Sequence, residues 1–166
     1  SAVLGDAKPR HVVIVAAEQE YDAKHTLPEF AKELEAKQGL KCTVLTSDSV
    51  TDIPGLEALD SADLLVMFMR RRELPEAQLN RFKAYFDAGK PVVALRTSCH
   101  AFQNWLEFDG KVLGCHYHNH YGTGATVHIH PADKATADPI LRGIKPKEWD
   151  TDATLYMVTP LAESAH

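Results

Sequence analysis

Five polar or reactive side chains follow one another directly after a short apolar run at residues 92–95. They are Arg96, Thr97, Ser98, Cys99 and His100. Gly89 and Pro91 bound the apolar run, which predicts a buried strand. Ligands of open α/β sheets bind in the crevice outside the carboxyl ends of the strands, so the polar segment is a predicted ligand site. The alternative is a strand-to-helix loop whose hydroxyl groups only cap the next helix.

The side chains of this segment suit different chemical roles. His100 is the candidate general acid or base, because an ordinary imidazole pKa of about 6.5 suits either role. Arg96 offers a planar guanidinium to hydroxyls, carboxylates or carbonyls. Cys99 comes directly before His100, and neighbours on such a turn usually point apart. A partly buried thiol is therefore favoured over a covalent role for Cys99.

Charged side chains also follow two other apolar runs, at residues 11–17 and 63–69. If these two strands lie beside the strand at 92–95, their carboxyl ends bring all these groups into one row. The expected catalytic residues are His100, Arg96 and Glu20. The expected ligand contacts are Glu18, Tyr21, Arg70, Arg72, Thr97, Ser98 and Cys99. The alternative is that carboxylates and arginines only pair on a solvated rim, where such pairs contribute little stability.

Strands and helices alternate along the first part of the chain. Strands are predicted at residues 11–17, 42–45, 63–69 and 92–95, and a helical turn at 54–59. One helix is expected to begin at Thr26 with a capping box to Glu29, and to end at Gly39. Its apolar stripe is Leu27, Phe30, Ala31 and Leu34. A second helix follows Pro75 and buries Leu79, Phe82, Tyr85 and Phe86. This alternation predicts a doubly wound, mostly parallel sheet in the order second, first, third, fourth strand.

The pattern is less regular after Trp105, where imidazoles become frequent. His116, His118 and His120 alternate, so on an extended segment they would face one way and could bind zinc or another divalent metal. The spacing matches none of the strong zinc signatures and includes no carboxylate, so a polar loop is the alternative. A half-exposed strand is expected at residues 125–130, a brief helix at 138–143 and a last strand at 155–158.

Length and composition are those of one ordinary globular domain, residues 1–166. The net charge is −5 and no long basic run or membrane-length apolar segment occurs, which argues against nucleic-acid and membrane partners. A small-molecule ligand is the expected partner, and a homo-oligomer is left open. The three cysteines form no disulfide framework. The chain begins with Ser, so we expect that a preceding segment has been removed. A soluble protein is expected, and the compartment, cytoplasmic or exported, is left open.

Five segments together resemble the ThuA-like (trehalose-utilisation) family, and most closely its variants from planctomycete-type bacteria. These segments are residues 11–21, 53–66, 70–75, 95–102 and 113–121. The resemblance implies the class I glutamine amidotransferase-like superfamily and a flavodoxin-like three-layer α/β/α sandwich. It also implies a role in carbohydrate metabolism, in a family whose biochemical activity is poorly defined.

The sequence departs from the amidotransferase pattern at one decisive position. An amidotransferase of this superfamily carries its catalytic Cys at the elbow after the strand, usually within Gly-x-Cys-x-Gly. Here Arg96 takes the elbow, and Cys99 follows three residues later without flanking glycines. Glutamine hydrolysis is therefore not expected. ThuA-like proteins often carry a His near the elbow, a place that His100 would take. The family usually continues past the position of Leu161, so part of a site is expected to lie beyond this chain.

Two functions are compatible with these residues. The first is an enzyme or binding protein that handles a carbohydrate or a related polyhydroxylated small molecule at the strand ends. Carboxylates accept from vicinal hydroxyls and guanidinium groups donate to them, which suits such a ligand. The second is a non-catalytic α/β interaction or accessory domain of a sugar-processing system, because a doubly wound sheet hosts many functions. A flavin is disfavoured, since the loop at residues 17–21 is acidic and lacks the groups that cradle a phosphate.

Overall fold

The computed structural model describes residues 8–131, 138–145 and 147–165. The chain divides into two compact units, Ser1–Leu113 and Gly114–His166, and each is described by itself below. The expectation of one domain over residues 1–166 stays a prediction.

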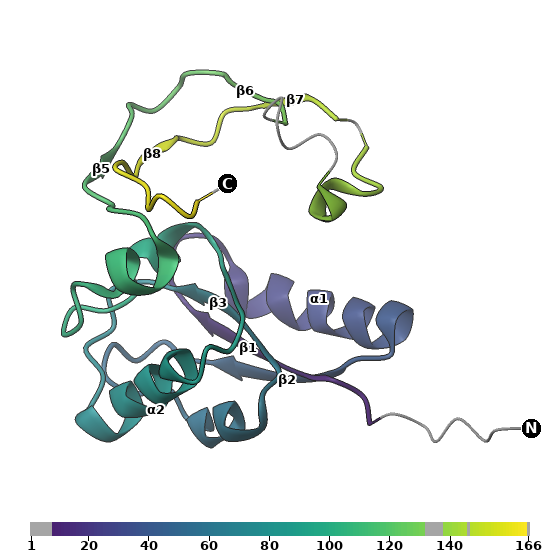
Figure 1. The fold of residues 1–166 in the computed structure, drawn as a ribbon, viewed down its shortest axis with the longest axis vertical. Coiled ribbons are helices and arrows are strands. Elements are labelled where there is room, and N and C mark those ends of the chain that lie inside the picture. Colours follow the sequence, from purple (N-terminus) through teal and green to yellow (C-terminus); the bar gives the residue numbers. More distant parts are fainter. Residues whose placement is uncertain (1–7, 132–137, 146, 166) are drawn as a thin grey trace, which may run out of the picture. The chain divides into compact units, whose positions relative to one another are not determined.

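The first unit is built on a four-stranded parallel sheet (Figure 1). Its strands are β1 (His11–Ala17), β2 (Lys41–Thr46), β3 (Leu64–Met69) and β4 (Val92–Ala94). The order β2-β1-β3-β4 and the parallel pairing confirm the sequence prediction. The burial expected for the fourth strand is wrong. β4 pairs with β3 along one side only in the described sheet, and the side chain of Val93 is 45% exposed.

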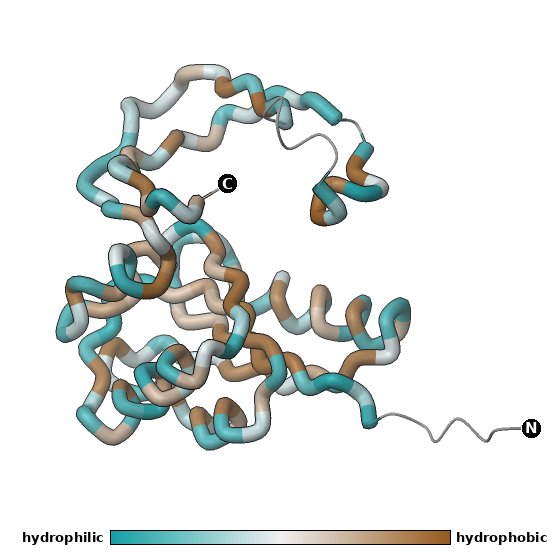
Figure 2. The backbone as a smooth tube through the Cα atoms, in the orientation of Figure 1, coloured by the Kyte–Doolittle hydropathy of each residue, from teal (hydrophilic) through white to brown (hydrophobic). Residues whose placement is uncertain are grey.

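Alternate residues of β1 face two separate hydrophobic layers. Val13 and Val15 pack with α2 (Glu76–Asp87) and the 3₁₀ turn η1 (Leu56–Ser61), whereas Val12 and Ile14 pack with α1 (Ala23–Gln38). Helices α1 and α2 therefore cover opposite faces of the sheet (Figure 1). The hydropathy colouring shows long stretches of hydrophobic residues in these central strands (Figure 2). The fold is a flavodoxin-like three-layer α/β/α sandwich, as predicted.

Helix α1 begins earlier than the capping-box pattern predicted. Its first residue is Ala23, after Asp22 in a left-handed conformation with φ 56°. The backbone N–H of Ala23 donates to the buried carboxylate of Glu18 at 3.0 Å, so Glu18 satisfies the helix start and Thr26 is not the cap. Phe30 is 44% exposed and does not belong to the buried stripe.

The remaining elements of the first unit agree with the predicted pattern. Gly39 ends α1 at φ 64°, a conformation that glycine adopts without steric cost. Helix α2 follows Pro75 and buries Leu79, Phe82 and Tyr85, while Phe86 is partly buried. The chain leaves β4 through a 3₁₀ turn, η2 (Arg96–His100), and Phe102 then packs at 5.2 Å between ring centroids against Phe82.

The second unit consists of two short antiparallel pairs. β5 (Asn119–His120) pairs with β8 (Tyr156–Met157), and β6 (Val127–Ile129) pairs with β7 (Trp149–Thr151). The turn η5 (Pro139–Leu141) lies within the predicted brief helix, and Asp138 caps it by accepting from the N–H of Ile140 at 2.9 Å. None of the helices in the described part of the chain has the length and apolar character needed to cross a membrane.

Candidate functional site

Backbone strain gathers at the carboxyl edge of the sheet. In the described residues, three non-glycine residues have a positive φ: Asp22 (56°), Arg71 (50°) and Arg96 (40°). They lie in the segments that follow β1, β3 and β4. L-residues adopt this conformation at a cost of about 1–2 kcal/mol, and such strained residues cluster at functional sites. This edge is therefore the candidate site, at the place that the sequence predicted.

A carboxylate and a guanidinium from different strand ends meet at this edge. Nη2 of Arg70 donates to Oε1 of Glu20 at 2.9 Å, and the two side chains are 27% and 43% exposed. Nε of Arg70 is buried and has no hydrogen-bond partner in the part of the chain that the structure describes. An unsatisfied buried donor costs about 1–3 kcal/mol. Arg70 therefore brings to the site one engaged nitrogen and one without an acceptor.

Tyr21 joins the loop after β1 to the residues after β4. Nε of Arg96 donates to the Tyr21 hydroxyl at 2.8 Å, and the guanidinium carbon lies 5.2 Å from the centre of the Tyr21 ring. The same ring also stacks on Phe68 with a centroid distance of 5.7 Å. Tyr21 thus holds the Arg96 side chain by a hydrogen bond and a cation–π contact together.

Cys99 and His100 are in contact, contrary to the expectation that they point apart. Sγ of Cys99 lies 3.4 Å from Nδ1 of His100. The pKa of His100 is lowered to about 4, mainly by burial and in addition by the charges of Arg70 and Arg71. The backbone N–H of Arg71 donates to the carbonyl of His100 at 3.0 Å, which holds these two residues side by side. The imidazole is therefore neutral at neutral pH and can accept a proton.

Thr97 and Ser98 fasten the turn η2 to strand β3. Both side chains are fully buried. The Thr97 hydroxyl donates to the carbonyl of Met69 at 2.9 Å; that of Ser98 donates to the carbonyl of Met67 and accepts from the N–H of Met69. These bonds give both residues a structural role, and the ligand contacts expected from the sequence stay a prediction.

Glu18 and Arg72 are likewise buried, with exposures of 2% and 1%. The Glu18 carboxylate accepts from three backbone N–H groups, those of Glu20, Tyr21 and Ala23. Burial lowers the pKa of Arg72, and the carboxylates of Asp48 and Glu18 oppose that shift. Both residues therefore stabilise the loops behind the edge, and their expected contact with a ligand stays a prediction.

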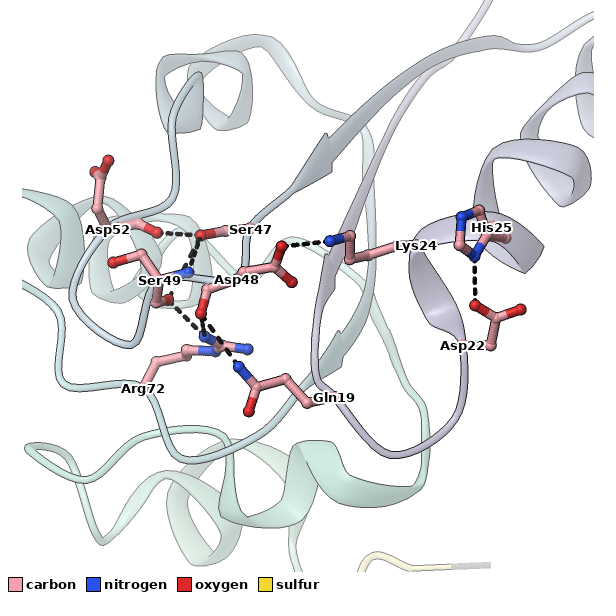
Figure 3. A network of polar contacts seen from close by, with 9 residues as sticks. All are labelled: Gln19, Asp22, Lys24, His25, Ser47, Asp48, Ser49, Asp52 and Arg72. Atoms are coloured by element: carbon pink, nitrogen blue, oxygen red, sulfur yellow. Dashed lines mark hydrogen bonds and ion pairs between the residues drawn. The ribbon is translucent and has the colours of Figure 1, made fainter.

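The loop after β2 takes part in this edge although the sequence analysis did not single it out. Arg72 donates through Nε to the carbonyl of Ala17 at 2.8 Å and through Nη1 to the carbonyls of Asp48 and Ser49 (Figure 3). The Asp48 carboxylate pairs with Lys24. Asp48 follows β2 as Glu18 follows β1 and Arg70 follows β3. This position after a strand is the sequence signal that could have identified the loop.

The predicted metal set is not assembled in the structure. His116, His118 and His120 lie on and beside β5, where the backbone N–H groups of His116 and His118 donate to the carbonyls of Val158 and Met157. Nδ1 of His120 donates to the carbonyl of Tyr121 at 2.8 Å. Across the described ranges, no group of three His, Cys, Asp or Glu side chains could hold a metal ion. The zinc prediction is therefore not confirmed.

Comparisons with known proteins bear on the fold. No protein-family model matches the chain, and no curated protein matches it in sequence. A solved structure of a protein described as ThuA-like, from Bacteroides uniformis ATCC 8492, is 16% identical over 93% of this chain, with a TM-score of 0.67. A second, from Parabacteroides merdae ATCC 43184, is 17% identical over 90% of this chain, with a TM-score of 0.60. The chain has the fold of these ThuA-like structures.

The ThuA-like resemblance is thereby confirmed for the fold. The chain spans 64% and 63% of the lengths of the two solved structures. In this ThuA-like fold the elbow after β4 is occupied by Arg96 in a left-handed conformation, and Cys99 lies inside the following turn. The elbow therefore presents a guanidinium, which is no nucleophile.

Proposed function

We propose that this protein binds a carbohydrate or a related polyhydroxylated small molecule at the carboxyl edge of its sheet, and acts on it without amidotransferase activity. One observation carries the proposal: side chains from three strand ends meet there in two cross-loop pairs, Glu20 with Arg70 and Tyr21 with Arg96. The side chain of Glu20 and the ring of Tyr21 are both more than 40% exposed, so a ligand can reach them.

The chemistry of these groups suits a ligand rich in hydroxyls. The Glu20 carboxylate accepts from hydroxyl groups, and the guanidinium groups of Arg70 and Arg96 donate to hydroxyl oxygens. His100 is the acid–base candidate. A pKa of about 4 keeps the imidazole neutral at neutral pH, which leaves it the role of general base rather than general acid, although the same shift weakens it as a base.

Two features support the absence of glutamine hydrolysis. The elbow residue after β4 is Arg96, so no thiol occupies the position where amidotransferases hold their nucleophile. The thiol of Cys99 lies three residues beyond that elbow, half-buried within η2. Incubation with glutamine should release no ammonia.

Ligand-dependent melting tests the binding proposal. Glucose, trehalose and other neutral sugars are screened for an increase in the melting temperature, and the best ligand is repeated with Arg96→Gly and His100→Asn. Glycine suits the positive φ at position 96, so that variant removes the guanidinium and keeps the backbone conformation. The matched control is Arg81→Ala. Arg81 lies on α2, and its exposed guanidinium pairs through Nη1 with Oδ2 of Asp60 at 2.6 Å.

We expect the wild type and Arg81→Ala to be stabilised alike, and the two site variants to lose the shift while remaining folded. Equal shifts in all four proteins would place the ligand elsewhere and contradict the proposal.

The second candidate is a non-catalytic accessory domain, and the occupation of the elbow by Arg96 is what favours it. The discriminating measurement is turnover of the bound sugar, followed by chromatography or NMR. Binding that depends on Arg96 with no chemical change in any ligand of the screen favours the accessory domain. A product whose formation requires His100 favours the enzyme.

A further inference from the structure

We propose that the ligand of this edge carries an oxyanion substituent, a carboxylate or a phosphate, which is bound by Arg71 beside His100. The inference rests on the proposed function, because it names the chemical class of that same ligand. Three observations support it. The carboxylates that precede α1 already have partners, Arg71 has a left-handed backbone conformation, and the charges around His100 are positive.

The carboxylates that precede α1 already have partners. The carboxylate of Glu18 is buried and accepts from three backbone N–H groups. That of Glu20 binds Arg70 at 2.9 Å, and that of Asp22 contacts the imidazole of His25. These acids therefore do not neutralise Arg71. The Arg71 side chain is exposed, and in the described part of the chain it makes no hydrogen bond or ion pair.

The backbone holds Arg71 at this place in a conformation that arginine does not favour. Its φ is 50°, and its N–H donates to the carbonyl of His100 at 3.0 Å. Glycine or asparagine would satisfy such a position at lower cost. An arginine at a left-handed position is explained if its guanidinium serves a ligand, because strained residues persist where function uses them.

The local field around His100 is positive even though Arg70 has a carboxylate partner. Both Arg70 and Arg71 lower the pKa of His100. In addition, Nε of Arg70 is a buried donor without an acceptor in the described part of the chain. A guanidinium binds carboxylate and phosphate through paired charge-assisted hydrogen bonds, and such bonds are stronger than those to a neutral hydroxyl. The paired carboxylates, the conformation of Arg71 and the positive charge around His100 therefore all favour an oxyanion as the bound group.

Matched sugars test the inference. Glucose, glucuronate and glucose 6-phosphate are titrated into the wild-type protein by calorimetry at low and high salt. Galactose, galacturonate and galactose 6-phosphate form a second matched set. We expect at least one acidic sugar of a set to bind about tenfold or more tightly than its neutral parent, because a charge-assisted hydrogen bond is stronger than one between neutral groups. The preference should weaken at high salt. The uronate and phosphate arms identify which oxyanion the site takes.

Two substitutions at position 71 connect the preference to the guanidinium. Arg71→Gly suits the backbone at φ 50° and removes the charge, whereas Arg71→Lys keeps a charge without the planar fork. We expect Arg71→Gly to bind acidic and neutral sugars equally, and Arg71→Lys to keep part of the preference. Arg81→Ala should behave as the wild type.

The remaining outcomes separate the two proposals. If neutral and acidic sugars bind equally to the wild type, the inference is wrong and the carbohydrate proposal stands. An acidic preference that survives Arg71→Gly also overturns the inference, since Arg71 would then not be the anion-binding group. If no sugar of either set binds to a protein shown to be folded, the result counts against both.

Discussion

The two halves of the same sheet edge use identical residue types for opposite purposes. Around Arg72, which is 1% exposed, the side chain donates to the carbonyl of Ala17 after β1 and to two carbonyls of the loop after β2, those of Asp48 and Ser49, which Figure 3 shows. Around Arg70, Arg71 and Arg96, the segments after β3 and β4 leave Arg71 exposed and the other two arginines half-buried, on a backbone that twice adopts a positive φ. We call buried, hydrogen-bonded residues such as Arg72 framework residues. The candidate site is formed by the more exposed arginines, two of which have a strained backbone.

Whether the arginines of each half are covered depends on the strand and loop beside them. The Arg72 side is covered by the loop after β2, whose carbonyls at Asp48 and Ser49 accept from the guanidinium. The Arg96 side lies after β4, the outer strand of the described sheet, which pairs along one side only. The contrast predicts that substitutions in the first half change stability and that those in the second change ligand binding.

The largest effect on stability is expected for Arg72→Met. Methionine fills much of the volume, but the carbonyls of Ala17 and Ser49 lose their donor and Glu18 loses the nearby positive charge. We expect the free energy of unfolding to fall by about 3 kcal/mol or more, as for other broken buried polar networks. Urea denaturation followed by circular dichroism measures it, with Arg71→Gly as the control. A loss below about 1 kcal/mol would remove the distinction between the two halves.

Glu18→Ala should have the next largest effect. The substitution leaves three backbone N–H groups without their acceptor, two in the loop before α1 and one at its first residue. We expect a loss of about 2 kcal/mol, and a smaller loss for Glu18→Gln, whose side-chain carbonyl still accepts. Hydrogen exchange at Tyr21 and Ala23 should quicken in the alanine variant. Unchanged exchange there would show that solvent satisfies these groups and that Glu18 is not a framework residue.

The sequence contained the strand order and the meeting of the three strand ends, because both follow from apolar runs and from the handedness of strand–helix–strand connections. It did not show that Arg72 would be buried while Arg70 stays partly exposed. That difference depends on the loop after β2, which covers one side chain and not the other. A residue-type pattern carries no information about such coverage.

Two local predictions are wrong because of nearby backbone geometry. The segment at Thr26 offers a capping box, but α1 begins at Ala23, whose N–H donates to the carboxylate of Glu18. Cys99 contacts His100 because both lie in the tight 3₁₀ turn η2. In both cases the conformation of a short segment overrides a rule based on residue type.

His100 offers a third test, through pH. Its pKa in the folded protein is lowered from 6.5 to about 4, so the unfolded chain binds a proton that the folded chain rejects as the pH falls between these values. The neutral imidazole therefore contributes stability that is complete above pH 6.5 and is lost progressively toward pH 4. The wild type should lose more stability across this window than His100→Asn. Arg71→Gly should raise the pKa of His100, measured by NMR titration; an unchanged pKa would mean that Arg71 does not act on the imidazole.

Glu20→Gln is expected to change stability least and therefore contrasts most sharply with Glu18→Gln. The Glu20–Arg70 pair is half exposed, and pairs of this kind contribute about 0–1 kcal/mol. Its replacement should leave the urea midpoint close to that of the wild type while reducing the melting shift produced by a sugar, because the carboxylate is an acceptor for hydroxyls. The same isosteric change at two positions of one loop then separates framework from site. If Glu20→Gln destabilised the protein as much as Glu18→Gln, the pair with Arg70 would belong to the framework and the candidate site would shrink to Tyr21, Arg71, Arg96 and His100.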